Sequence, residues 1–307
     1  MPKYGATTHF TEMIPVKTCI RLLLIFIFSL VVRADDELRL KAPASLPSHL
    51  QMGIPGAPDL ILARDGFAVG YSYRRRQALW VCYILTADQL AMRQVKRSNR
   101  FRADPLVENR PVQPEEYDRS GFDRGHLAPA SDMTYSQQTM EQSFFMTNIS
   151  PQIPACNRGI WKRIEAQARA WAMQEKRLFV ITGPIFDDDG TMGDTGISVP
   201  KAFYKVLMDL TPPYKMIAFI VPNQKTKRPI SAFVATVDEV EATTGMNFFS
   251  NLEDSLQVML EQKAEINDWC VPLKRDPRRK RRTQVRRAAP SPSPAAAREK
   301  DSANRPR

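Results

Sequence analysis

Residues 118–133 read DRSGFDRGHLAPASDM, and our prediction of the fold and the function starts from the centre of this stretch, the tetrapeptide DRGH at 123–126. The chain contains three histidines, and His9 and His49 lie in the N-terminal part, which we expect to precede the folded domain. His126 is therefore the one imidazole predicted to be available for proton transfer near neutral pH.

The neighbours of His126 suit a site that receives a phosphate group. Arg124 supplies a planar guanidinium, and Gly125 allows the backbone to approach a ligand closely. Pro129 and the small residues on either side of it argue against a continuous helix. We therefore expect a strand to end near His126 and a loop to follow.

Residues 157–175 show the clearest helical periodicity in the chain, with Ile160, Ile164, Ala168 and Trp171 on one face. Asn157 occupies the predicted N-cap position, and Glu165 follows about two helical turns later, roughly 80° around the axis. Because helical side chains lean toward the N-terminus, Glu165 can approach Asn157. The spacing alone leaves two interpretations open, a helix cap with a surface acid or a metal site.

These segments together resemble the DNA/RNA non-specific endonucleases, the family that includes mitochondrial endonuclease G and is built on a ββα-metal (His-Me) finger. The resemblance rests on the DRGH motif, on NISPQ at 148–152, and on Asn157, Trp161 and Glu165. It extends through ALWV at 78–81, TGPI at 182–185 and PKAFYK at 200–205, and covers about residues 66–260.

The resemblance implies an α+β fold: a mostly antiparallel central sheet with packed helices and a ββα-metal finger that carries the active site. It also implies a metal-dependent endonuclease that cuts DNA and RNA without regard to sequence and leaves 5′-phosphate and 3′-hydroxyl ends. Homodimers occur among the relatives, so a homodimer is a further expectation.

The resemblance assigns roles to individual residues. His126 is expected to be the general base, Asn157 to bind Mg²⁺ (Mn²⁺ or another divalent cation being alternatives), and Glu165 to orient the waters of the cation. Arg124 and Asn148 are expected to hold the site or the phosphate, and Asp123 to fix the loop. The predicted substrate-binding residues are Arg100, Arg102 and Arg158, the last standing where the family pattern has glutamine.

The net charge of +11 does not predict a basic nucleic-acid-binding surface on the folded body. Residues 274–307 hold thirteen Lys or Arg and three acids, a net of +10, which leaves +1 for residues 1–273. Binding of a polyanion by the body must therefore depend on local basic residues and a metal.

Four segments are predicted along the chain. They are a signal peptide at 1–34, with Met13 as an alternative start, an extended lead-in at 35–59, the nuclease domain at 60–272, and a basic, Pro- and Ala-rich disordered tail at 273–307. The apolar run at 22–32 is too short to span a bilayer and ends at a VRA cleavage sequence. We expect export to the periplasm or the medium, without stable membrane insertion after cleavage. A retained N-terminal membrane anchor is the alternative.

Secondary-structure patterns support this layout. Apolar, β-rich runs at 67–73 and 78–85 predict a hairpin, and Thr86 with Gln89 predicts a capping box at the start of a short helix. Further strands are expected at 178–182, 202–210 and 216–221, and helices at 237–244 and 252–262. The run Asp187–Gly190 is expected to be a turn. Among the cysteines, Cys82 is predicted to lie in the core, and Cys156–Cys270 is the one disulfide considered.

Two other functions remain open. One is a nucleic-acid-binding protein that acts through its Arg-rich tail and has an inactive nuclease core. The other is a phosphodiesterase for a smaller ester, which a deep closed pocket would favour over an open groove.

Overall fold

The computed structural model describes residues 38, 40–41, 46–92, 94–187 and 190–269. The signal segment, the tail, Cys270 and the centre of the Asp187–Gly190 run therefore lie outside the described residues. No helix within the described ranges is both long enough and apolar enough to cross a membrane.

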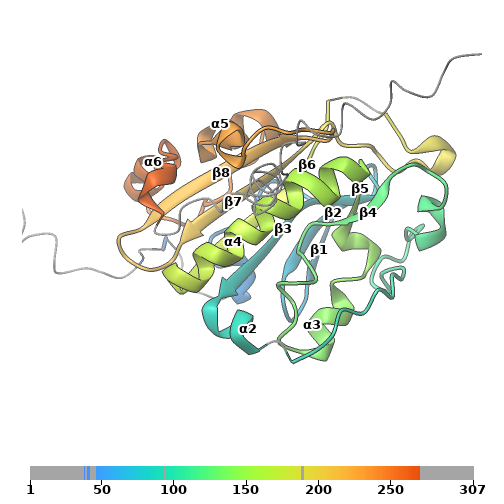
Figure 1. Ribbon diagram of the computed structural model, residues 1–307, viewed down its shortest axis with the longest axis horizontal. Coiled ribbons are helices and arrows are strands. Elements are labelled where there is room, and N and C mark those ends of the chain that lie inside the picture. Colours follow the sequence, from blue (N-terminus) through green and yellow to red (C-terminus); the bar gives the residue numbers. More distant parts are fainter. Residues whose placement is uncertain (1–37, 39, 42–45, 93, 188–189, 270–307) are drawn as a thin grey trace, which may run out of the picture.

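A seven-stranded antiparallel sheet forms the centre of the molecule (Figure 1). In spatial order its strands are β1 (Leu60–Ala63), β2 (Ala68–Ser72), β3 (Gln77–Thr86), β6 (Arg177–Ile185), β7 (Ala202–Asp209), β8 (Lys215–Pro222) and β9 (Val234–Ala235). Every neighbouring pair runs antiparallel. The predicted α+β fold and its strands at 178–182, 202–210 and 216–221 are confirmed.

The predicted hairpin and capping box are also confirmed. Strands β2 and β3 pair across a short turn. Helix α2 (Ala87–Met92) then begins where Thr86 Oγ1 accepts from the Gln89 N–H and Gln89 Oε1 accepts from the Thr86 N–H, both at 3.1 Å. This reciprocal pair satisfies two backbone donors that the helix itself leaves free.

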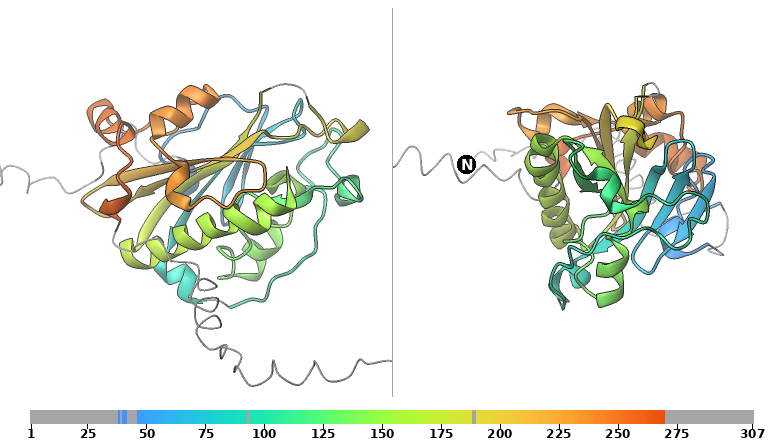
Figure 2. Two further views of the ribbon diagram at one scale, coloured as in Figure 1. Left: turned by 45° about the horizontal axis from the view of Figure 1, so that its top comes forward. Right: turned by 90° about the vertical axis from the view of Figure 1, so that its right-hand side faces the viewer.

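Alternating side chains of the sheet create two apolar layers. On β7, Phe203 and Leu207 pack on the side of α4 (Lys162–Glu175), while Tyr204 and Met208 pack on the opposite side. That second side is covered by α5 (Val237–Thr244) and α6 (Asp254–Glu261), so the sheet lies between two sets of helices (Figure 2). The helices expected at 237–244 and 252–262 are therefore confirmed.

The segment before β1 packs against this second layer. A short 3₁₀ turn, η1 (Ser48–Leu50), leads into Met52, which is fully buried with Leu50. His49 is buried as well, and its Nε2 lies 3.2 Å from the Asp65 carbonyl oxygen. The expectation that His49 lies outside the folded region is wrong, because its apolar neighbours draw the segment onto the core.

The ββα-metal finger lies at one end of the α4 side. Its strands β4 (Asp123–His126) and β5 (Ile149–Gln152) form a separate two-stranded antiparallel sheet. Between them lie α3 (Gln137–Gln142) and the turn η3 (Met146–Asn148). A strand that ends at His126 and continues into a loop agrees with the sequence prediction.

The helix of the finger differs from its prediction. It passes through a π-helical turn, η4 (Cys156–Trp161), before the regular helix α4. The Asn157 N–H donates to the Ile153 carbonyl at 3.0 Å, so Asn157 lies inside the helical segment and is not its N-cap. Because a π-turn is wider than an α-turn, the rotation predicted between Asn157 and Glu165 does not apply.

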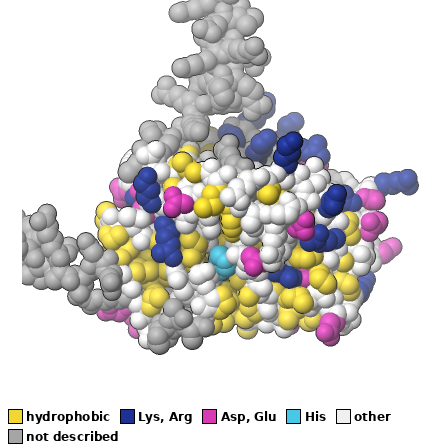
Figure 3. Space-filling view, turned by 90° about the horizontal axis from the view of Figure 1, so that it is seen from below, with side chains coloured by type: hydrophobic (Ala, Val, Ile, Leu, Met, Phe, Trp, Pro, Cys, Tyr) yellow, Lys and Arg dark blue, Asp and Glu magenta, His cyan; other side chains and the backbone are white. Residues whose placement is uncertain are grey.

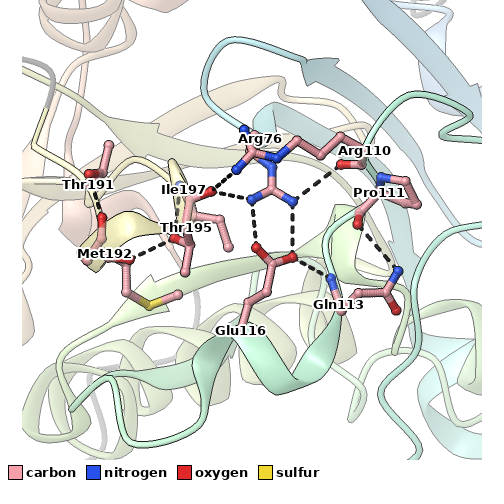
Figure 4. A network of polar contacts seen from close by, with 10 residues as sticks. Arg76, Arg110, Pro111, Gln113, Glu116, Thr191, Met192, Thr195 and Ile197 are labelled. Atoms are coloured by element: carbon pink, nitrogen blue, oxygen red, sulfur yellow. Dashed lines mark hydrogen bonds and ion pairs between the residues drawn. The ribbon is translucent and has the colours of Figure 1, made fainter.

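A polar network ties the loops near the finger to the sheet (Figure 4). Arg76, in the β2–β3 turn, donates to both carboxylate oxygens of Glu116 at 2.6 and 3.0 Å and to the Arg110 carbonyl at 3.3 Å. Arg76 and Arg110 both donate to the Thr195 carbonyl. These contacts connect three loops that are far apart in the sequence.

The remaining described turns and the cysteines complete the fold. The 3₁₀ turns are η2 (Pro114–Tyr117), η5 (Gly193–Thr195), η6 (Ile230–Phe233) and η7 (Ile266–Asp268). Cys82 lies in the core as predicted, and Cys156 is a free, buried thiol. The Cys156 side of the disulfide considered is therefore unpaired in the structure.

Gly183 provides a test of how tightly the sheet is packed. A Cβ atom there would lie 2.3 Å from the Leu79 carbonyl oxygen and 2.6 Å from Tyr204 Oη. Because the carbonyl belongs to a paired strand, Gly183→Ala should lower the free energy of unfolding by about 1–3 kcal/mol. Chemical denaturation measures the change. Gly159→Ala is the control, since a Cβ there meets nothing within 4 Å, and an equal loss in both variants would contradict the packing explanation.

Candidate active site in the ββα finger

His126 is held at the end of β4 between two aromatic rings. Its ring centroid lies 5.5 Å from that of Phe101 and 4.8 Å from that of Phe144, the latter edge-on at 82°. The side chain is only 8% exposed, and Nε2 is buried without a hydrogen-bond partner in the described part of the chain. The imidazole is thus fixed by ring packing and keeps one nitrogen unused.

The surroundings keep this imidazole neutral. Burial lowers the pKa of His126 to about 3, and the positive charge of Arg97 acts in the same direction. A neutral imidazole carries a lone pair, so His126 is in the form that accepts a proton at neutral pH.

Asn148 fixes the loop that follows His126. Its Nδ2 donates to the carbonyls of Ala128 and Ser143 at 2.9 Å, and its Oδ1 accepts from the Ala128 N–H at 2.9 Å. The side chain is fully buried. Its amide is engaged by the protein at both ends, so its place in the structure is that of a clamp behind the site.

Asn157 and Arg158 converge on one carboxylate. Asp123 Oδ2 accepts from Asn157 Nδ2 at 2.9 Å and from Arg158 Nε at 2.8 Å, and Asp123 Oδ1 accepts from Arg158 Nη2 at 2.5 Å. The Asp123 side chain is 13% exposed, whereas that of Arg158 is 73% exposed. The first contact orients the Asn157 amide, because its nitrogen is committed to Asp123 and its oxygen is left to receive a cation.

Arg124 binds within the protein. Its Nε and Nη2 donate to the Pro114 carbonyl at 3.0 and 2.6 Å, and Nη2 contacts Asp118 Oδ1 at 2.5 Å. The guanidinium carbon lies 5.5 Å from the Phe101 centroid. Arg124 therefore anchors the turn before β4 and stacks on the ring that also packs against His126.

Glu165 belongs to a group of charged side chains between α4 and the sheet. Arg169, one turn later on α4, donates to Asp132 Oδ1 at 2.8 Å, and Tyr83 Oη donates to Asp132 Oδ2 at 3.0 Å. Glu165 is partly exposed, and burial raises its pKa to about 7 against the attraction of Lys205 and Arg169. Its carboxylate can therefore change protonation state close to neutral pH.

The predicted phosphate-binding arginines before the finger divide in their placement. Arg100 is exposed. The Arg102 guanidinium carbon lies 4.5 Å from the Phe145 centroid, and Nη2 lies 3.8 Å from Glu141 Oε2. Arg97, which the sequence singled out only as part of a basic cluster, is the arginine that acts electrostatically on both His126 and Glu165.

Signals for the residues that were missed are present in the sequence. Arg169 follows Glu165 at the i,i+4 spacing typical of a helical ion pair. Lys205 interrupts an otherwise apolar strand, the pattern expected of a charge buried for a purpose. Arg97 has no comparable pattern, because its position depends on the path of an irregular loop.

The donor set suits a hard, weakly held cation. An amide oxygen of Asn157 with a carboxylate nearby at Glu165 is the kind of oxygen environment that Mg²⁺ accepts while it keeps most of its waters. Among the described residues, the cluster of three acids that could hold a metal is Asp238, Glu241 and Glu261, on α5 and α6. That cluster includes none of the predicted site residues.

The surface charge agrees with the nearly neutral body deduced from the composition. On the face drawn in Figure 3, basic side chains are scattered among acidic and hydrophobic ones, and one histidine is visible. Local basic residues such as Arg97 must therefore supply any attraction for a polyanion on this face.

Comparison with known proteins identifies the family. Residues 47–255 match the model of the DNA/RNA non-specific endonucleases. The chain belongs to the DNA/RNA non-specific endonuclease family. This is a family of metal-dependent nucleases, and the finger described above is its expected site.

Individual members of the family resemble the chain over most of the described domain. Nuclease C1 of Cunninghamella echinulata var. echinulata is 37% identical over 68% of this chain and 90% of that protein. Human mitochondrial endonuclease G is 30% identical over 65% of this chain and 72% of that protein. The structure is similar to EndoG in the crystal structure of its EndoGI complex, with a TM-score of 0.63 and 29% identity over 69% of this chain and 95% of that chain.

The neutral state of His126 can be tested through stability. The folded pKa lies below the unfolded value of 6.5, so below pH 6.5 the unfolded chain binds a proton that the folded chain does not. Between pH 7 and 5 this should cost the wild type about 2 kcal/mol that His126→Gln does not lose. Urea unfolding of both proteins at the two pH values measures it. Burial also lowers the pKa of His49, which both proteins retain, and equal pH dependence would disprove a buried neutral His126.

Proposed function

We propose that this protein is a metal-dependent endonuclease that hydrolyses phosphodiester bonds of DNA and RNA without sequence preference. Family membership supports the reaction class. The observation that carries the assignment to this site is the neutral His126, with its unpaired Nε2, in the same finger as an Asn157 amide whose oxygen is left available by Asp123.

The residues divide the tasks of phosphodiester cleavage. When bound, Mg²⁺ would supply charge stabilisation for the phosphoryl oxygens. His126 accepts the proton of the attacking water as general base. Asn157 offers its amide oxygen to the cation, and Glu165 accepts hydrogen bonds from water in the site. Arg97 places a guanidinium near His126 and Glu165, where a phosphate would be attracted.

Recognition through the phosphate explains the proposed lack of specificity. A cation and guanidinium groups contact the backbone, which is common to every sequence and similar in DNA and RNA. We therefore propose that both polymers are cut and that the ends carry a 5′ phosphate and a 3′ hydroxyl, as the family resemblance implies.

Cleavage of plasmid DNA and of RNA tests this function. We expect the chain from Asp35 onward to cut both with Mg²⁺ and neither with EDTA, and His126→Ala to lower the rate by about 10²–10⁴-fold because the base is lost. Thermal unfolding of the variant checks that it is folded. Tight nucleic-acid binding by the wild type without any cutting would instead favour a binding protein that acts through its tail.

The Asp123–Asn157 contact gives a separate prediction about the cation. Asp123→Ala frees the Asn157 amide, so the Mg²⁺ concentration for half-maximal rate should rise by about 10–100-fold. Asp118→Ala is the matched control, because Asp118 is an acid of the same loop that pairs with Arg124. Rates measured across Mg²⁺ concentrations distinguish the two variants. An unchanged Mg²⁺ requirement in Asp123→Ala would show that Asp123 does not orient the ligand.

Localisation and assembly are proposed from the sequence and the resemblance. Residues 1–34 support export through a signal peptide, and the described domain is compatible with the homodimers known among the relatives.

A further inference from the structure

Lys205 is a buried ammonium without a hydrogen-bond partner. It lies on β7 with 1% exposure, and its Nζ finds no acceptor in the described part of the chain. Other buried cations are paired: Arg76 with Glu116 and Arg64 with Asp104. A charge placed in a core without a hydrogen-bonded partner is costly, so its presence calls for an explanation.

The surroundings of Lys205 are aromatic on two sides and charged toward the finger helix. Its Nζ lies 5.0 Å from the Trp161 centroid and 5.9 Å from that of Tyr83, so ring faces partly stabilise the charge. Glu165 on α4 and Asp132 in the loop after β4 attract it, while Arg169 on α4 repels it.

A purely structural role does not require the charge. An unbranched apolar residue such as methionine would fill the space between Trp161 and Tyr83 and would bury no ammonium. What methionine would not do is act on the carboxylates of the finger. Of the positive charges that act on Glu165, Lys205 has the largest effect, ahead of Arg169 and Arg97, and Asp132 opposes all three.

We propose that Lys205 is a positioning residue whose buried ammonium keeps the Glu165 carboxylate ionised, and thus able to accept hydrogen bonds from water in the site. This inference deepens the proposed nuclease function and rests on it. Without Lys205, partial burial and the repulsion of Asp132 favour a protonated Glu165. A protonated carboxyl donates a hydrogen bond and loses part of its capacity to accept them.

The first measurement does not depend on activity. The carboxyl carbon of Glu165, in the metal-free full chain labelled with ¹³C-glutamate, is followed by NMR as the pH changes, and its signal is assigned by its loss in Glu165→Gln. In Lys205→Met the midpoint should move upward by about one pH unit or more. Lys215→Met is the matched control, because Lys215 on the neighbouring strand pairs with Glu175 and Asp209.

The second measurement is the pH–rate profile on plasmid DNA. The acid limb of Lys205→Met should move upward with the NMR midpoint, so that the rate lost at pH 7 is recovered at higher pH. In the Glu165→Gln background, Lys205→Met should have no further effect on rate. Thermal unfolding should show Lys205→Met to be as stable as the wild type or more so. If that variant does not fold, Lys205→Gln, also uncharged, takes its place.

The outcomes separate the two proposals. A wild type that cuts no nucleic acid would reject the nuclease function, while the NMR titration would still decide whether Lys205 controls Glu165. An unchanged Glu165 midpoint in Lys205→Met would overturn the positioning role. So would an equal loss of rate with and without Glu165.

Discussion

The hydrogen bonds of the Asn148 amide are the contacts on which the candidate site depends most directly. They join the end of β5's lead-in turn to the loop after β4, through the backbone of Ala128 and Ser143. His126 lies two residues before Ala128, and Phe144 directly follows Ser143. One buried side chain therefore fixes both the imidazole and a ring that packs against it, and the amide can do so because every one of its bonds is sheltered from water.

Charge is distributed in this molecule by depth more than by surface area. The body carries little net charge, yet Glu165, Asp132, Arg169 and Lys205 lie in the layer between α4 and the sheet. In that environment each charge acts strongly on its neighbours because water does not screen it well. This explains how a nearly neutral domain can still create a site with unusual protonation states at His126 and Glu165.

Local patterns in the sequence predicted most of the sheet and its helices. The hairpin, the Thr86–Gln89 capping box and the alternation of β7 arise from neighbouring residues, and the structure has all of them. Features that depend on distant contacts were not predicted. The packing of Leu50 and Met52, the edge strand β1 and the path of the loop that carries Arg97 are set by surfaces formed elsewhere in the fold.

The site shows the same division. His126, Asn157 and Glu165 were found from a motif, because the resemblance fixes them in order along the chain. The engagement of Arg158 and Arg124 within the protein could not be predicted, because both are typical phosphate-binding residues whose partners, Asp123 and Pro114, become adjacent only after folding. Lys205 required the strand register to be known before its nearness to Glu165 had meaning.

The π-helical turn at Cys156–Trp161 limits which changes in chain length the finger can accept. A π-turn holds about one residue more than an α-turn, so removal of a single residue there would leave a regular and more comfortable helix. That repair would rotate everything before the deletion by about 100° relative to α4. Asn157 would then leave Asp123 even though every side chain of the site was still present. In this segment the number of residues is therefore as constrained as their identity.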